Sequence, residues 1–212
     1  MKVVNSVLLT GIFALGAAAG TLSPCGTSGM TVVRANDGSR YVIYVFREGP
    51  DVAFQFPGTG LSFPDGLDAR KMLNIDGVVF ESIFVKRPDF MKTTEIVGDI
   101  ELLKKHKDHE VAFIKSTTSP LTKFVEHGPR ERPAGNGQPS FTFYLWQMVN
   151  PQDLKGTSQY FLTTVSAGEV VVLSAIVPDP SKESVAMDAF QSYAASFQHI
   201  LRKEQCPADP KK

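Results

Sequence analysis

The sequence has no excess of charge of either sign. Lysine and arginine together number 22, aspartate and glutamate also number 22, and the formal net charge is zero. Proteins that bind nucleic acid carry a basic face or stripe, because they must neutralise phosphate groups. We therefore expect no nucleic-acid partner.

Cysteine is also scarce, with only Cys25 and Cys206. They lie near opposite ends of the chain, and the termini of a domain are often close together. An even number of cysteines in an exported protein is typical of a disulfide framework. We expect a Cys25–Cys206 disulfide, and the alternative is two unpaired thiols in terminal tails.

The first two dozen residues have the order of a cleavable export signal. Lys2 supplies one positive charge, and a short apolar stretch and then a run of small residues follow it. Signal peptidase accepts only small side chains just before its cut. Ala17 and Ala19 fit that rule, so we predict a signal peptide over residues 1–19, to within one residue.

Two other interpretations of this leader stay open. An uncleaved membrane anchor needs roughly 20 strongly apolar residues, and polar residues and glycines dilute this run. Lipidation is the other, because residues 22–25 loosely resemble a lipobox, although Pro24 stands where a small residue is expected before Cys25. We expect a periplasmic or secreted protein without a stable membrane span, and a lipid anchor at Cys25 is the alternative.

Most of the remaining sequence has the pattern of paired β-strands. Three pairs of runs rich in β-branched and aromatic residues are separated by turn sequences, and Asp-Gly between apolar runs is a strong hairpin signal. A long strand is expected over residues 140–149, with Phe141, Phe143 and Leu145 on one face. The three predicted hairpins join residues 40–47 to 52–56, 71–75 to 78–85, and 158–165 to 169–177.

Two segments have helical periodicity. The first lies near residues 94–107, capped by Thr93 or Thr94, and short strands are expected after it at 110–114 and 121–126. The second begins at the Asp179 cap, with Pro180 in its first turn, and is expected to end near Leu201.

We therefore predict an α+β fold, a mainly antiparallel β-sheet packed by the long C-terminal helix and by the helix near residues 94–107. The single domain is expected to cover residues 39–204. An N-terminal tail, 20–38, contains Cys25, and a C-terminal tail, 205–212, contains Cys206.

The last third of the chain resembles the PsbP-like superfamily. The resemblance lies in the strand at residues 160–165, the strand at 168–175, and a proline-started helix that ends near Ile200. It implies a small α/β/α sandwich with an antiparallel sheet, in a family whose members are mostly accessory or binding proteins. The resemblance has no specific motif, so it assigns no functional residue.

Residues able to bind a metal gather at one place. His106 and His109 stand three positions apart and could share a face of a helix, but the sequence offers no third ligand. The simpler interpretation is a polar helix end. We expect no cofactor, and the sequence has no nucleophile and base pattern that indicates a hydrolase.

Three further residues are candidates for a partner surface. Arg130 and Arg132 lie in the segment 127–139, which is rich in proline and glycine and is expected to be a loop. Trp146, the only tryptophan, is expected in the core and would mark a ligand or partner surface if it were exposed.

The function that the sequence favours is that of an exported, non-catalytic binding or accessory protein of the cell envelope or secreted fraction. Its partner would be another envelope protein, contacted through a sheet face or through segment 127–139. The alternatives are a metal-dependent or hydrolytic enzyme centred on His106 and His109, and a carrier of a small apolar ligand. The oligomeric state is not indicated.

Overall fold

A computed structural model of the chain describes most of the predicted domain. The predicted signal peptide, Cys25, Cys206, Thr93 and Thr94 lie outside the described residues, so the export, disulfide and threonine-cap assignments stay predictions. The described residues are 29–34, 40–46, 52–57, 61–62, 72–92, 95–118, 121–135, 139–149 and 156–199.

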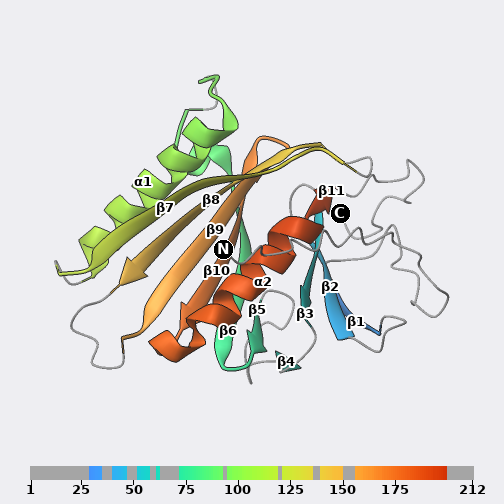
Figure 1. Cartoon of the computed structure of the whole chain (residues 1–212). Helices are drawn as coiled ribbons and strands as arrows, with labels where there is room; N and C mark the ends of the chain where they lie inside the picture. Colours follow the sequence, from blue (N-terminus) through green and yellow to red (C-terminus); the bar gives the residue numbers. More distant parts are fainter. Residues whose placement is uncertain are drawn as a thin grey trace, which may run out of the picture.

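A seven-stranded sheet forms the centre of the molecule (Figure 1). Its strands run in the order β4-β5-β6-β10-β9-β8-β7, and all neighbouring pairs are antiparallel. This arrangement confirms the predicted α+β class. The strands are β4 Leu61–Ser62, β5 Met72–Ile75, β6 Val78–Val85, β7 Lys123–Arg132, β8 Phe141–Val149, β9 Ser158–Ser166 and β10 Glu169–Val177.

Two tight turns fix the register of this sheet. Asp76 and Gly77 join β5 to β6 with φ angles of 49° and 89°, and Ala167 and Gly168 join β9 to β10 with 50° and 80°. Positive φ at both central residues is typical of the type I′ turn, whose twist matches that of paired strands. The second and third predicted hairpins are confirmed.

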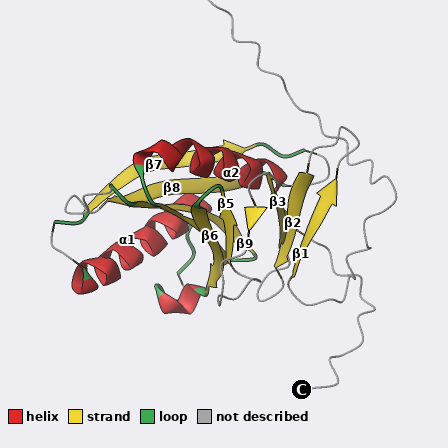
Figure 2. Cartoon of the chain, turned by 90° about the horizontal axis from the view of Figure 1, so that it is seen from below, coloured by secondary structure: helices red, strands yellow, loops and turns green. Residues whose placement is uncertain are grey.

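Helices cover both faces of the sheet. Figure 2 shows α2 (Glu183–Ser196) above the sheet and α1 (Asp99–Thr117) below it. The Asp179 carboxylate accepts a hydrogen bond from the Ser181 amide at 2.9 Å, which confirms the predicted cap at the short 3₁₀ turn Pro180–Lys182 before α2. A second 3₁₀ turn, Arg87–Asp89, follows β6.

A smaller antiparallel sheet packs beside α2. It consists of β1 (Gly29–Arg34), β2 (Arg40–Phe46), β3 (Val52–Pro57) and β11 (Gln198–His199), in the order β1-β2-β3-β11. The pairing of β2 with β3 confirms the first predicted hairpin. Strand β1 lies within the predicted tail of residues 20–38, where the β-branched sequence Thr31-Val32-Val33 favours a strand.

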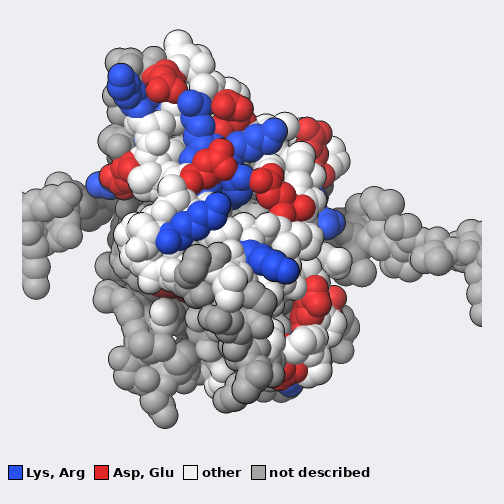
Figure 3. All heavy atoms as spheres, turned by 90° about the vertical axis from the view of Figure 1, so that its left-hand side faces the viewer, with Lys and Arg blue, Asp and Glu red and all other residues white. Residues whose placement is uncertain are grey.

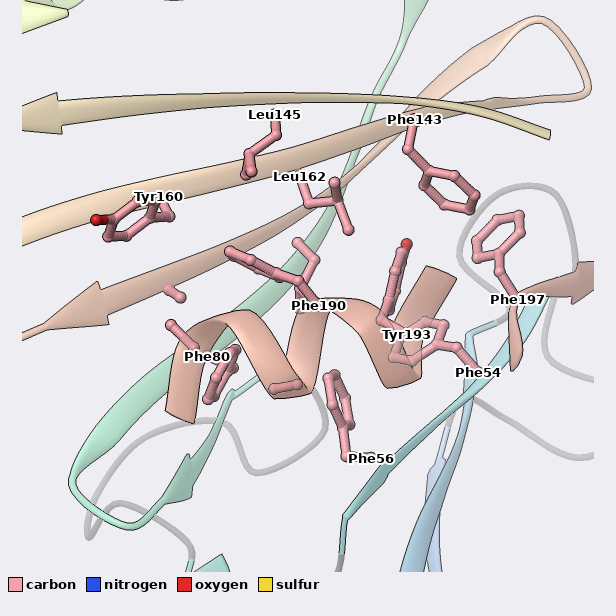
Figure 4. Close-up of a cluster of buried hydrophobic side chains, with 14 of the residues drawn as sticks. Phe54, Phe56, Phe80, Phe143, Leu145, Tyr160, Leu162, Phe190, Tyr193 and Phe197 are labelled. Carbon is pink, nitrogen blue, oxygen red and sulfur yellow. The ribbon is translucent and has the colours of Figure 1, made fainter. Parts of the chain in front are cut away.

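One continuous apolar core joins the two sheets through α2. Tyr193 of α2 lies 4.5 Å from the Phe54 ring of β3 and 6.2 Å from the Phe143 ring of β8, as ring centroids. Figure 4 shows Phe54 and Phe56 from the small sheet and Phe143 and Leu162 from the large sheet around this helix. Seven of the 15 phenylalanines of the chain are buried in this cluster.

The helix near residues 94–107 is longer than predicted. α1 begins at Asp99 and continues to Thr117, so the strand expected at 110–114 is wrong. Val111 and Ile114 pack against the same cluster as Leu103, which continues the helical spacing of the buried face for two more turns. The short apolar run there belongs to a helix face.

Two other boundaries differ from the prediction. Strand β7 runs through Arg132, so the first half of the predicted loop 127–139 is an edge strand. Pro129 is tolerated at an edge, and Gly128 lies at a register shift with a φ of 83°. Helix α2 ends at Ser196 instead of Leu201, because the chain becomes extended and β11 pairs with β3.

Neither described helix combines the length and the apolar composition needed to cross a bilayer.

Candidate partner surface on the sheet

The central strands β6 and β10 each have one face in the core under α2 and the opposite face on the α1 side of the sheet. Phe80 and Ala175 pair with each other and belong to the core under α2. Side chains alternate along a strand. Val79, Ile83 and Ile176 therefore point to the α1 side of the sheet.

Helix α1 covers only part of that side. It packs against β8 and β9, and Leu102 and Leu103 belong to the same buried cluster as Trp146 and Val172. Beyond it, Ile176 is 43% exposed and Ile83 is 36% exposed, although both belong to central strands. A central strand usually has its apolar side chains covered, so exposure here indicates a surface that another molecule can cover.

We call this surface the uncovered face and define it as Val79, Ile83 and Ile176. Val79 pairs with Ile176 across the two strands. Further along β6, Ile83 pairs with the buried Val172. Ser174 and Glu81 pair between these rows, and Glu81 is only partly buried. The uncovered face is therefore apolar with one carboxylate near its middle.

The side of the molecule that carries α1 has a different character. Basic and acidic side chains lie intermixed there (Figure 3). Lys107 Nζ lies 2.5 Å from Glu126 Oε1 and 2.6 Å from Asp108 Oδ1, and the Tyr144 hydroxyl donates to Glu126 Oε2. We call these residues the charged ridge. Their opposite charges neutralise one another, so the ridge links α1 to β7 without creating a patch of a single charge.

The pKa values in this ridge follow from the contacts. Hydrogen bonds from the Lys107 ammonium and from the Tyr144 hydroxyl hold the pKa of Glu126 below its usual range. Burial, reinforced by the hydrogen bond to Glu126, raises the pKa of Tyr144 to about 12. Tyr144 is therefore a neutral donor at physiological pH.

The two histidines of the predicted metal pair have unlike surroundings. His106 is 1% exposed and packs edge-on against the Phe90 ring at 5.3 Å, whereas His109 is exposed. Burial, with the nearby His109 as the smaller cause, lowers the pKa of His106 to about 4. Within the described part of the chain, no group of three histidine, cysteine, aspartate or glutamate side chains is placed to hold a metal.

The structure separates the three predicted partner-surface residues. Trp146 is 1% exposed and stacks on Phe161 at 3.9 Å, so its core role is confirmed and a surface role for it is wrong. Arg130 is exposed on β7. Arg132, at the end of the same strand, is half-buried against Phe141.

The uncovered face was not found from the sequence. Its residues lie in ordinary strand patterns, and nothing local indicates that α1 stops short of β6 and β10. The signal that could have revealed this face is that β6 and β10 carry apolar residues on both faces, with Ile83 and Ile176 on the face opposite the core under α2.

These elements define an α+β sandwich with a helix on each face of an antiparallel sheet. No family model matches the chain, and no curated protein matches it either. Among solved structures, the chain is similar to the solution structure of cyanobacterial PsbP (CyanoP) from Synechocystis sp. PCC 6803. The TM-score is 0.46 at 12% sequence identity, and the alignment covers 88% of this chain and 99% of that chain. This is a weak PsbP-like likeness of fold, as the last third of the sequence predicted, and it extends to fold alone.

Proposed function

We propose that the chain is an exported, non-catalytic accessory protein that binds another envelope protein through the uncovered face. The observation that carries this proposal is the exposure of Ile176 and Ile83 on two central strands. Covering such side chains contributes roughly 25 cal/mol for each Å² of apolar surface removed from water.

The export part of the proposal rests on the leader sequence and on the two cysteines. Cleavage after Ala19 would release the chain, and a Cys25–Cys206 disulfide would join its two ends. Mass spectrometry of the protein isolated from its native host tests this part. A protein whose mass matches a chain starting at residue 20, less two hydrogens relative to the reduced form, supports it. A lipid adduct on Cys25 instead supports the anchored alternative.

The binding part can be tested by site-specific photo-crosslinking in the native host. A photoreactive residue at position 176 is expected to give an adduct with a partner protein. Val125 is a matched control, because it is 41% exposed but lies on the opposite face of the sheet from Phe124, which packs in the α1 cluster.

The expected result is an adduct from position 176 that is absent from position 125 and is lost when Ile83→Glu is added. Both substitutions lie at exposed positions, so thermal unfolding should remain close to that of the unmodified protein. Equal adducts from positions 176 and 125, or an Ile176 adduct unaffected by Ile83→Glu, would contradict the assignment of this face.

A further inference from the structure

The uncovered face lies beside α1 at the distance that suits a second helix. Helix α1 packs on β8 and β9, whereas the exposed Ile83 and Ile176 belong to β6 and β10, the next two strands of the sheet. Neighbouring strands lie about 4.8 Å apart, so a helix centred over β6 and β10 would lie roughly 10 Å from α1. Packed helices have interaxial distances of about 8–10 Å, so the two helices would be in contact.

An extended peptide is less suited to this face than a helix is. Strand β6 pairs with β5 on one edge and with β10 on the other, and β10 pairs with β6 and β9. Neither strand therefore has a free edge to which a partner strand could be added. A helix needs no such edge, because its backbone groups bond within the helix. The partner is therefore recognised through its side chains.

The side chain between the apolar positions of β6 is a carboxylate. Glu81 alternates with Val79 and Ile83 along the strand, so these three side chains point to the same side of the sheet. Glu81 is partly exposed, and its carboxylate has no hydrogen bond or ion pair with another described residue. A partner that covers the apolar side chains also removes this carboxylate from water, which is unfavourable unless a cation meets it.

The same carboxylate opposes pairing of the face with itself. In a two-fold dimer the same patch of each copy lies against the other, which would bring the two Glu81 carboxylates together near the centre of the contact. Like charges that lose water together oppose association, whereas a lysine or arginine at this place is attracted. The negative surface of an anionic membrane is disfavoured for the same reason.

We propose that the uncovered face binds an amphipathic helix of its partner, which places a lysine or arginine over Glu81 between two apolar residues. This inference rests on the proposed function and adds the chemistry of the partner. Two residues of a strand span about 6.6 Å and four span about 13 Å. Four residues of a helix span about 6 Å and eight span about 12 Å. In a helix roughly parallel to β6, an apolar residue at i therefore lies over Val79 and Ile176, a basic residue at i+4 over Glu81, and an apolar residue at i+8 over Ile83.

Three synthetic helical peptides of equal length test this pattern. The lysine peptide has leucine at i, lysine at i+4 and leucine at i+8. The leucine peptide has leucine at i+4 instead. The displaced peptide has alanine at i+4 and its lysine at i+2, on the opposite side of the helix, so its net charge is that of the lysine peptide. Isolated helices shorter than about 15 residues are marginal in water, so each peptide carries a side-chain staple on its solvent side.

Binding is followed by the methyl NMR signals of Ile83 and Ile176 in the mature protein, assigned with Ile83→Val and Ile176→Val. Ile100 is a control in the same spectrum, because it is 38% exposed but lies on the same side of α1 as Lys107, which faces β7. The lysine peptide is expected to shift the Ile83 and Ile176 signals saturably and to leave Ile100 unchanged. It should bind about tenfold more tightly than either other peptide, because it alone pairs with the carboxylate.

Substitution of Glu81 should reverse this preference. Glu81→Gln is expected to weaken the lysine peptide about tenfold and to strengthen the leucine peptide, because no unpaired charge is then covered. Glu131→Gln removes the same charge from an exposed position on β7 and should change the binding of either peptide less than twofold. Thermal unfolding of both variants should stay close to that of the wild type, which shows that the fold is retained.

The basic helix is overturned if the three peptides bind equally or if Glu81→Gln and Glu131→Gln have equal effects. It is also overturned if the Ile83 and Ile176 signals shift with protein concentration alone, which indicates a second copy, or if phosphatidylglycerol vesicles shift them more than the lysine peptide does. An adduct from position 176 in the native host without a lysine preference leaves the proposed function in place and refutes only the basic helix. A lysine preference without an adduct supports the helix as the ligand of this face and counts against an envelope partner.

Discussion

The buried imidazole of His106 makes a specific prediction about stability and pH. The side chain is 1% exposed, and neither ring nitrogen has a hydrogen-bond partner within the described structure. The nearest carboxylate oxygen, Glu110 Oε1, is 3.8 Å from Nε2, too far for a hydrogen bond. A proton added to this ring in the folded protein would therefore be poorly solvated.

The magnitude follows from the pKa difference between the two states. The pKa of His106 falls from 6.5 in the unfolded chain to about 4 in the folded one. Between these values the unfolded chain binds a proton that the folded chain does not, so the free energy of unfolding decreases as the pH falls. One pKa unit corresponds to 1.36 kcal/mol, which gives a loss of about 3 kcal/mol across this window.

The assay is urea unfolding at several pH values between 7 and 4, followed by the fluorescence of Trp146. This tryptophan lies in the same cluster that α1 covers. In His106→Leu the part of the pH dependence that comes from this residue should disappear. In the control His109→Gln most of it should remain, because burial and not the neighbouring charge is the larger cause.

The decisive quantity is the difference in unfolding free energy between the wild type and His106→Leu at each pH. It should change by about 3 kcal/mol in favour of the variant from pH 7 to pH 4. If this difference stays constant over the range, His106 does not titrate as a buried group, and the description of α1 packed over it is refuted.

Two further substitutions test the fold. The Tyr160 hydroxyl accepts from Gln147 Nε2 and donates to Glu183 Oε1, both at 2.8 Å, so Tyr160→Phe should lower the free energy of unfolding by about 1–3 kcal/mol. An unchanged value in chemical denaturation would mean that this chain of hydrogen bonds does not form. Ala167 has a φ of 50°, where a Cβ is strained, so Ala167→Gly should raise the unfolding temperature slightly, corresponding to about 1 kcal/mol or less. A lower unfolding temperature would contradict the turn geometry.

Much of the fold could be predicted because its signals are local. The turn at Asp76 and Gly77 needs only two residues to define a hairpin, and the alternation of Phe141, Phe143 and Leu145 places one face of β8 in the core. The cap at Asp179 is likewise a contact between near neighbours.

The differences arise where tertiary contacts decide between local alternatives. Residues 110–114 are apolar enough for a short strand, but α1 continues there because its face meets the sheet. Strand β7 contains Gly128 and Pro129, which usually indicate a loop, but an edge position and a register shift accommodate both. Such outcomes depend on neighbours that are distant in the sequence.

The candidate sites were less predictable than the fold. Arg132 was selected from its sequence surroundings, but His199, whose pKa its charge lowers, belongs to another strand and comes near it only in the folded chain. The exposure of Ile83 and Ile176 depends on how far α1 extends across the sheet. Neither arrangement has a spacing that a single sequence could display.

The two-residue strand β11 determines when the small sheet can finish folding. It pairs with β3 through Gln198 and Ala53, and nearby the Gln55 amide donates to the Ser196 hydroxyl at 2.8 Å across a separation of 141 residues. A chain synthesised from its N-terminus can pair β1, β2 and β3 early, but the free edge of β3 has no partner and this sheet has no α2 to pack on until residues 183–199 have been made. The small sheet is therefore the last part to be closed, and the loop closure it requires slows folding.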